Sequence, residues 1–327
     1  MRGNCVDRVS PTACCAVLIA ACACTLQARA QAWVPGKGQG SVGMTYQQKQ
    51  STRLTNADGS SANFGKVIDR TLTLDLDYGL SERWAVSVGV PFSRNRYSGD
   101  DPHDPRGFPF PNDQRFIDDG QDHAGWSDWS VGLRYQWRER PFLVTPFVAY
   151  LQPSHDYTFF SHAALGTHQR AVQLGVHVGN WFPLPLQAMY WQAGYAYTIE
   201  QSTRKIDRVA YAFLPDDRRV NHGALSLEFG GNITPRLGAH LLVNHTNSYG
   251  HGVHAIEDFA NPDGSPNFNN IFYHDQLLLL RTTKASVGLE YQLTDRYQLS
   301  FDWGRTLRAA DAHFWDYETS IGISRRF

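Results

Sequence analysis

Residues 71–92 alternate between apolar and polar side chains in two runs that a short turn separates. In the first run Leu72 and Leu74 alternate with Thr73 and Asp75, and in the second run valine recurs at every other position. A period of two residues is typical of a β-strand, so the pattern predicts a hairpin with one apolar face. That face would either cover the core of a soluble sheet or contact lipid.

The same alternation recurs along the chain and predicts twelve strands. Most of these segments are long enough to cross a bilayer when tilted, and they exceed a typical soluble strand. The predicted strands lie in 39–50, the hairpin 71–92, 126–137, 142–152, 172–179, 187–200, 225–230, 237–244, 285–292, 297–304 and 317–327.

The predicted connections alternate between short and long. The short ones are 79–83, 138–141, 182–186, 232–235 and 293–296, and the long ones are 51–68, 93–125, 152–168, 201–218, 246–278 and 307–315. Short turns at one end and long loops at the other are typical of transmembrane barrels. The sequence therefore predicts an all-β fold, a transmembrane antiparallel up-and-down β-barrel of about twelve strands. Its apolar face, with Leu72, Leu74, Leu76 and Val86, is expected to contact lipid.

The first thirty residues differ from the rest of the chain. A short basic start precedes an apolar stretch, and Ala28-Arg29-Ala30 fits the small-x-small rule for signal peptidase. We therefore expect a signal peptide over 1–30, a barrel over 31–327 and a location in the bacterial outer membrane. Ile19-Ala20-Ala21-Cys22 offers the alternative of lipoprotein processing at Cys22. All 5 cysteines lie in this leader, so the barrel is expected to have no disulfide.

The overall composition does not contradict a barrel. The mean hydropathy of −0.40 looks soluble, but half of each barrel strand is polar and no long apolar run is needed. The formal charge of −1 gives no reason to expect a nucleic-acid partner. Aromatic residues lie near strand ends, as in membrane-interface girdles. They are Trp84, Phe92, Trp126, Trp137, Trp181, Trp191, Tyr297, Trp303 and Trp315.

The polar faces of the predicted strands supply the candidate lumen. These residues mix both signs of charge, so they could fill a small barrel by pairing or line a narrow pore. The lumen candidates are Asp75, Asp77, Arg134, Gln136, Gln173, His177, Gln192, Glu228, His240, Asn244, Glu290, Asp302 and Glu318. No cofactor is expected. Loops 93–125 and 246–278 are rich in Pro, Asn, Asp and Gly, and we expect them to gate the entrance.

Two chemical alternatives rest on histidines. Most of them fall in long loops, His155, His162 and His168 in one loop and His251 and His254 in another. This spacing lacks cysteine and a second tight cluster, so exposed loop histidines are expected rather than a metal site.

A barrel enzyme that acts on lipids would need His and Ser on one strand face. His245 and Ser248 are three residues apart and so point to opposite faces, and no catalytic motif such as G-x-S-x-G is present. We therefore expect no enzymatic activity.

Several stretches resemble the bacterial outer-membrane family named for meta-pathway phenol degradation, also described as transporter-like. They are WVPGKGQGSVGMTYQ, LDLDYGLSERWAVSVGVPF, GWSDWSVGLRYQW and Gln152-Pro153 followed by Ala164-Leu165-Gly166-Thr167, with Ser154 and His155 replacing the usual Thr-Gly. The resemblance implies an outer-membrane channel for aromatic or other small hydrophobic solutes and offers no catalytic residues.

These observations lead to one functional expectation with two alternatives. The chain is expected to be a passive outer-membrane channel for uptake or efflux of small hydrophobic or aromatic solutes. The alternatives are a non-conducting surface barrel whose loops bind a partner, and the barrel enzyme. The partners expected are outer-membrane lipid, a small solute and the barrel-assembly machinery, which reads a terminal Phe327. Residues 31–38 are expected to be too short for a plug.

Overall fold

The computed structural model describes residues 31–99, 117–159, 161–203, 217–267, 270–271 and 273–327. The predicted signal peptide and the alternative processing site at Cys22 lie outside these residues, as do parts of loops 93–125, 201–218 and 246–278. Among the described residues, no helix is long and apolar enough to span a bilayer.

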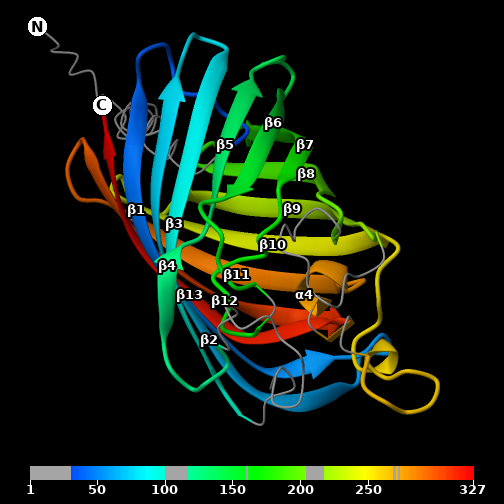
Figure 1. The fold of residues 1–327 in the computed structure, drawn as a ribbon. Helices are drawn as coiled ribbons and strands as arrows, with labels where there is room; N and C mark the ends of the chain where they lie inside the picture. The colour runs from blue at the N-terminus through cyan, green and yellow to red at the C-terminus, as the bar shows by residue number, and fades with distance from the viewer. Residues whose placement is uncertain (1–30, 100–116, 160, 204–216, 268–269, 272) are drawn as a thin grey trace, which may run out of the picture.

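The described chain forms a closed antiparallel β-barrel, as the alternation predicts (Figure 1). The strands are β1 (Gly40–Thr55), β2 (Ser61–Gly79), β3 (Trp84–Ser98), β4 (His123–Trp126), β5 (Asp128–Tyr135), β6 (Leu143–Pro153), β7 (Ala171–Trp181), β8 (Met189–Glu200), β9 (Val220–Asn232), β10 (Leu237–Gly250), β11 (Arg281–Gln292), β12 (Tyr297–Ala310) and β13 (Ala312–Arg326). Both β4 and β5 pair with β3, so they act as one barrel strand interrupted at Ser127, and the barrel has twelve strands.

The barrel closes between its first and last strands. β1 pairs with β2 on one side and with β13 on the other, both antiparallel. At the short-turn end, the end of the barrel with the tight connections, Gly40 and Phe327 exchange two backbone hydrogen bonds of 3.0 Å. Closure satisfies the backbone groups that an open sheet edge would leave unpaired.

The outer face of the barrel is apolar. The exposed fraction lies between 45 and 52% for Leu74, Leu174, Val287 and Phe301. A water-soluble protein rarely exposes so large an apolar surface. Six predicted girdle residues are exposed in the same way, namely Trp84, Phe92, Trp126, Trp137, Tyr297 and Trp303. Phe92 and Trp303 lie in the middle of β3 and β12 and not at a strand end. Such a face fits a barrel surrounded by lipid.

Two predicted girdle residues are instead part of interior contacts. Trp181 packs edge-on against Trp33 with ring centroids 6.1 Å apart, and the Lys49 ammonium lies 3.9 Å from the Trp315 ring centroid. The prediction for these two residues is therefore wrong.

Two predicted long loops are tight turns in the structure. β1 and β2 continue as a hairpin through most of 51–68 and leave only 56–60 as the turn, where Gly59 has φ +85°. β12 and β13 likewise leave only Asp311 between them, with φ +50°. Glycine and aspartate both tolerate this left-handed backbone. These two connections therefore lie at the long-loop end although both are short turns.

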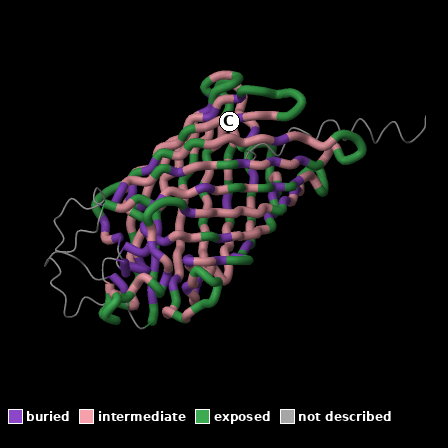
Figure 2. Tube along the Cα trace, turned by 90° about the vertical axis from the view of Figure 1, so that its right-hand side faces the viewer, coloured by how far each residue is buried: buried purple, intermediate pink, exposed green. Residues whose placement is uncertain are grey.

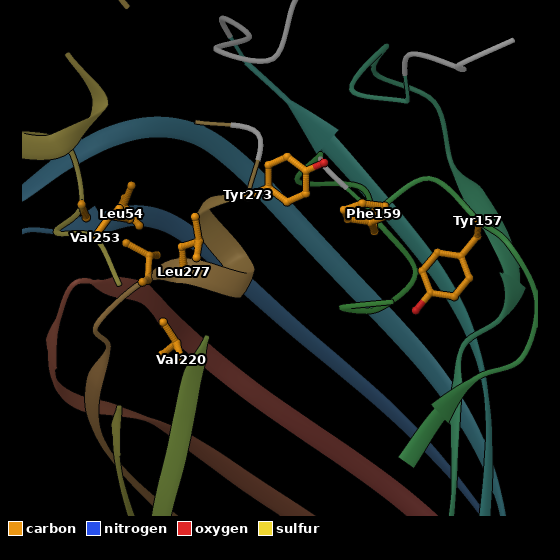
Figure 3. Close-up of a cluster of buried hydrophobic side chains, with 9 residues drawn as sticks. Leu54, Tyr157, Phe159, Val220, Val253, Tyr273 and Leu277 are labelled. Carbon is orange, nitrogen blue, oxygen red and sulfur yellow. The ribbon is translucent and has the colours of Figure 1, made fainter. Parts of the chain in front are cut away.

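The buried apolar core lies at the long-loop end and not along the barrel axis. Figure 2 shows buried residues gathered at the end of the barrel away from the C-terminus. The segment between β10 and β11 contributes η1 (Glu257–Phe259) and α4 (His274–Leu277) there. We call the buried cluster at this end the mouth core; it consists of Leu54, Tyr157, Phe159, Val220, Val253, Ala255, Tyr273, Leu277 and Leu278 (Figure 3).

Candidate channel lumen

A cavity of about 600 Å³ lies inside the barrel wall. Inward positions of β1, β3, β5 and β13 contribute small residues to it, among them Gly43, Gly89, Gly132 and Ser324. The charged groups on its lining are four carboxylates, those of Asp75, Asp77, Glu228 and Asp302, and one guanidinium, that of Arg134. The cavity therefore offers hydrogen bonds and, with histidine neutral, a net negative charge.

The structure places eight of the thirteen lumen candidates on this lining. They are Asp75, Asp77, Arg134, Gln173, His177, Glu228, His240 and Asp302. Gln136, Gln192 and Glu290 are buried beside the cavity and hydrogen-bond to neighbouring groups. Glu318 forms an ion pair with Lys284 nearer the long-loop end, and Asn244 lies opposite Lys284 in the strand register.

A polar network around His240 extends over the inner face of the barrel wall. Its Nε2 lies 3.0 Å from Asp302 Oδ1, and Ser320 Oγ donates to Asp302 Oδ2 at 2.9 Å. Glu290 Oε1 lies 3.9 Å from His240 Nδ1, and Gln298 donates to the other Glu290 oxygen at 2.8 Å. Four neighbouring strands, β10 to β13, supply these groups, so the strand register alone brings them together.

Arg134 holds the segment before β1 inside the short-turn end. Its guanidinium pairs with Asp77 and donates to the carbonyl oxygens of Gln31 at 3.3 Å and Trp33 at 3.4 Å. Ala32 between them is fully buried. Residues 31–38 are short, as the sequence indicates, but contrary to expectation their first residues occupy the lumen.

Further contacts fix this segment to the barrel wall. The Ala32 N–H donates to Gln192 Oε1 at 3.3 Å, and Thr145 Oγ1 donates to the Ala32 carbonyl at 2.6 Å. The Trp33 ring packs edge-on against Trp181 and Tyr190. These contacts narrow the barrel at its short-turn end.

A second charged layer lies between the cavity and the mouth core. Lys49 pairs with Asp69 at 3.1 Å, and Lys284 pairs with Glu318. Both ammonium groups lie near the Trp315 ring, at 3.9 and 5.9 Å from its centroid. Lys49, Asp69 and Lys284 are not among the predicted lumen residues. The stretches that flank the turn at 56–60 are too polar to show the alternation of the other strands, so no sequence pattern indicated the first two.

The loops expected to gate the entrance are only partly responsible for the mouth core. Loop 246–278 supplies Val253, Tyr273 and Leu277, and the described part of loop 93–125 supplies Ile117 to a neighbouring buried cluster. Loop 152–168, which was not expected to gate, supplies Tyr157 and Phe159. Figure 3 shows residues of these segments beside Leu54 of β1 and Val220 of β9.

The loop histidines do not share one environment. His155 and His251 are exposed, as expected, and His168 and His254 are partly exposed. His162 is only 8% exposed, so the expectation of an exposed residue is wrong there.

The two residues considered for lipid hydrolysis do not meet. His245 Nδ1 lies 3.0 Å from Thr283 Oγ1, whereas Ser248 Oγ lies 2.9 Å from Nδ1 of His222 on the neighbouring strand. His245 and Ser248 therefore form no pair.

Comparisons with known proteins bear on the fold. No family model matches the chain, and no curated protein matches it. The crystal structure of an outer-membrane channel from Pseudomonas putida F1 superposes with a TM-score of 0.64 at 16% identity, covering 91% of this chain and 98% of that chain. The NanC porin has a TM-score of 0.46 at 10% identity, covering 86% of this chain and 98% of that chain. The CymD monoaromatic hydrocarbon channel has a TM-score of 0.42 at 12% identity, covering 90% and 89%. At 16% identity the likeness to the Pseudomonas putida F1 structure is one of fold, the closed antiparallel barrel.

Proposed function

We propose that this chain is an outer-membrane channel through which small solutes diffuse passively. The observation that carries the proposal is a polar cavity of about 600 Å³ inside a closed barrel whose outer face is apolar. A barrel that served only to fill the membrane would gain nothing from keeping carboxylates beside a cavity, because desolvating a charged group is costly even when it has a partner. The short-turn end would face the periplasm and the long-loop end the outside, as in barrels of this class.

The lining favours some solutes over others. Four carboxylates against one guanidinium favour cations and neutral hydrogen-bonding solutes over anions. An aromatic surface is also present, because Phe147 and His177 stack on the lining with ring centroids 4.8 Å apart. An aromatic solute that carries a hydroxyl group would match both features. This agrees with the solute class that the family resemblance implies, which remains a proposal.

The mouth core and residues 31–33 would act as the two restrictions along the path. Loops 93–125 and 246–278 would gate the outer entrance together with loop 152–168. Because residues 31–33 and the mouth core occupy the two ends of the barrel, they also support the alternative of a non-conducting surface barrel. A current measurement separates the two functions.

The test is single-channel recording of the folded chain in a planar bilayer under a salt gradient. We expect openings with a reversal potential that favours cations, and a smaller preference in the Asp302→Asn and Glu228→Gln variants. Asp263→Asn is the matched control, because Asp263 lies in an exposed external turn. Phenol added to one side should reduce the current. A folded, heat-modifiable barrel that carries no current would contradict the channel, and anion preference would contradict the role of the carboxylates.

A further inference from the structure

Three histidines converge beneath the long loops of the barrel. His162 comes from the β6–β7 loop, His274 from α4 and His313 from the start of β13. One ligand nitrogen of each lies within 4.8 Å of the others. His162 and His274 are 8% and 3% exposed, and His313 is partly buried. Since the three residues come from separate segments, only the folded mouth brings them together.

The separations within the cluster suit ligands around one metal ion. His274 Nε2 and His313 Nε2 lie 3.4 Å apart, and Asp275 Oδ1 lies 3.3 and 3.4 Å from these two nitrogens. Hydrogen bonds between such groups are usually shorter. A tetrahedral Zn²⁺ with bonds of about 2.0 to 2.2 Å holds its ligand atoms about 3.3 to 3.6 Å apart. The three separations therefore match one face of such a tetrahedron.

Neighbouring groups orient two of the imidazole rings. His162 Nδ1 lies 3.2 Å from Asp118 Oδ2, and His274 Nδ1 donates to the Ile271 carbonyl at 2.8 Å. Asp118 is itself fixed by the backbone N–H groups of His162 and Ala163. A carboxylate or carbonyl on the outer ring nitrogen is the usual arrangement around metal-binding histidines, because it sets the tautomer that leaves Nε2 as the ligand.

Aromatic packing restricts the rings further. Phe64 stacks on His162 with centroids 4.8 Å apart and lies 5.0 Å from His313, and Tyr97 also stacks on His162 at 4.7 Å. A site whose rings are already positioned loses little conformational freedom when an ion binds.

We propose that His162, His274, His313 and Asp275 form a binding site for Zn²⁺ or a divalent transition metal with the same ligand preference. Three imidazoles and one carboxylate suit zinc, copper or nickel, whereas Mg²⁺ and Ca²⁺ prefer oxygen ligands. A bound ion would join the β6–β7 loop, the β10–β11 segment and β13 at one point. The site goes beyond the channel function and does not depend on it.

The test is a Zn²⁺ titration of the full chain, folded in detergent and purified without a histidine tag, against a chromophoric chelator. We expect one tight equivalent, and binding weakened more than about 100-fold in His274→Ala and His313→Ala. Asp118→Asn, which alters the carboxylate beside the His162 ring but none of the four proposed ligands, should weaken binding about 10- to 100-fold. His155→Ala and His251→Ala are matched controls that remove exposed histidines from the same two loops, and they should bind as the parent does.

Two further readouts keep the proposal falsifiable if a variant folds poorly. Heat modifiability on gels reports whether each variant forms the barrel. Co²⁺ added to the parent chain should give the strong visible bands of a tetrahedral site, and Zn²⁺ should remove them. The absence of a tight equivalent in the parent, weak octahedral Co²⁺ bands, or unchanged binding in folded His274→Ala and His313→Ala would each overturn the site. Current plays no part in these measurements, so the channel can fail while the site stands.

Discussion

Gly288 lies where a single added methyl group would disturb the lumen network most. A Cβ at this position would lie 2.2 Å from His240 Cε1 and 2.4 Å from Asp302 Oδ1. We expect Gly288→Ala to push these side chains apart and to lower the free energy of unfolding by about 1 to 3 kcal/mol, the usual cost of overpacking. Urea unfolding of the refolded barrel in detergent measures this change.

Gly89→Ala is the matched control for Gly288→Ala. Gly89 also lines the cavity, but a Cβ there would meet only Ser130 Oγ at 3.1 Å. A hydroxyl can rotate away, so this change should be much milder. Equal losses in the two variants would show that the His240–Asp302 pair is not what Gly288 accommodates.

At the residue scale, alternation alone predicted which side chains share the lumen face but not how they pair. The step of two residues puts Asp75, Asp77 and Glu228 on one side of the wall, and the structure places all three on the cavity. Pairing depends on strand register, which a single sequence leaves open. The contact of Arg134 with residues 31–33 had no sequence pattern at all, because an extended segment that crosses a lumen has no periodicity.

At the scale of the elements, packing in the mouth core is expected to hold the long loops in place. Leu277 in α4 is fully buried in a cluster that includes residues of β1, the β6–β7 loop and β9. Leu277→Ala removes this packing and should lower the stability of the docked loops by about 2 to 5 kcal/mol. The barrel wall should stay folded, because strand pairing holds it together. We expect a folded barrel with faster loop proteolysis and longer channel openings.

Leu307→Ala is the comparison for this prediction, since Leu307 is 58% exposed near the same end of the barrel. It should leave proteolysis and openings unchanged. Loss of heat modifiability in Leu277→Ala would contradict the separation of loop packing from the wall.

The β6–β7 loop should also respond to acid. Burial lowers the pKa of His168, and the nearby Asp156 carboxylate offsets this only in part. The ring packs neutral against Phe159 and Tyr157. A histidine with a lowered pKa stabilises the folded loop above its unfolded pKa of about 6.5, and this contribution is lost as the pH falls towards the folded value.

Near-ultraviolet circular dichroism of the mouth tyrosines in neutral and mildly acidic buffer measures this response. We expect the signal to weaken reversibly below about pH 6.5. His168→Asn keeps a residue that tolerates the φ of +57° and removes the titrating group, so its signal should vary less with pH. An equal response in this variant would assign the effect to another group.

Element boundaries were predicted well where turns are short and poorly where strands continue beyond the expected bilayer. The connections at 79–83, 232–235 and 293–296 fall between strands as expected. The segment Asn56-Ala57-Asp58-Gly59-Ser60 contains Asp-Gly, a known hairpin sequence, but its flanking residues are too polar to extend the alternation. His162 was misjudged for a related reason, because burial by another loop has no local pattern.

At the scale of the whole molecule, the C-terminal residue takes part in barrel closure and is expected to act in membrane assembly as well. Phe327 is 50% exposed, stacks on Tyr78 with centroids 6.3 Å apart and hydrogen-bonds Gly40 only through its backbone. Phe327→Ala should therefore change the stability of the refolded barrel by less than about 0.5 kcal/mol. We expect its amount in the outer membrane of cells to fall, because the assembly machinery is proposed to read this side chain.

Leu293→Ala serves as the control for assembly, because Leu293 is 48% exposed in a turn at the same end. Membrane fractions compared by immunoblot give the readout. Equal amounts of the Phe327→Ala and parent proteins would remove the proposed role of the terminal residue. The class of fold was the best predicted property, since the alternation shows an even number of antiparallel strands that share one apolar face, and such a sheet can close on itself.

The position of the mouth core has a consequence for the order of folding. Leu54, Val220 and Leu277 lie in distant parts of the chain. They come into one cluster only after the strands have closed into the barrel. Contacts between such distant residues form late, because the chain between them must first be confined. We therefore expect two kinetic phases, insertion and closure of the wall, then slower docking of the loops. Between them, a newly inserted barrel would be transiently open at its outer end.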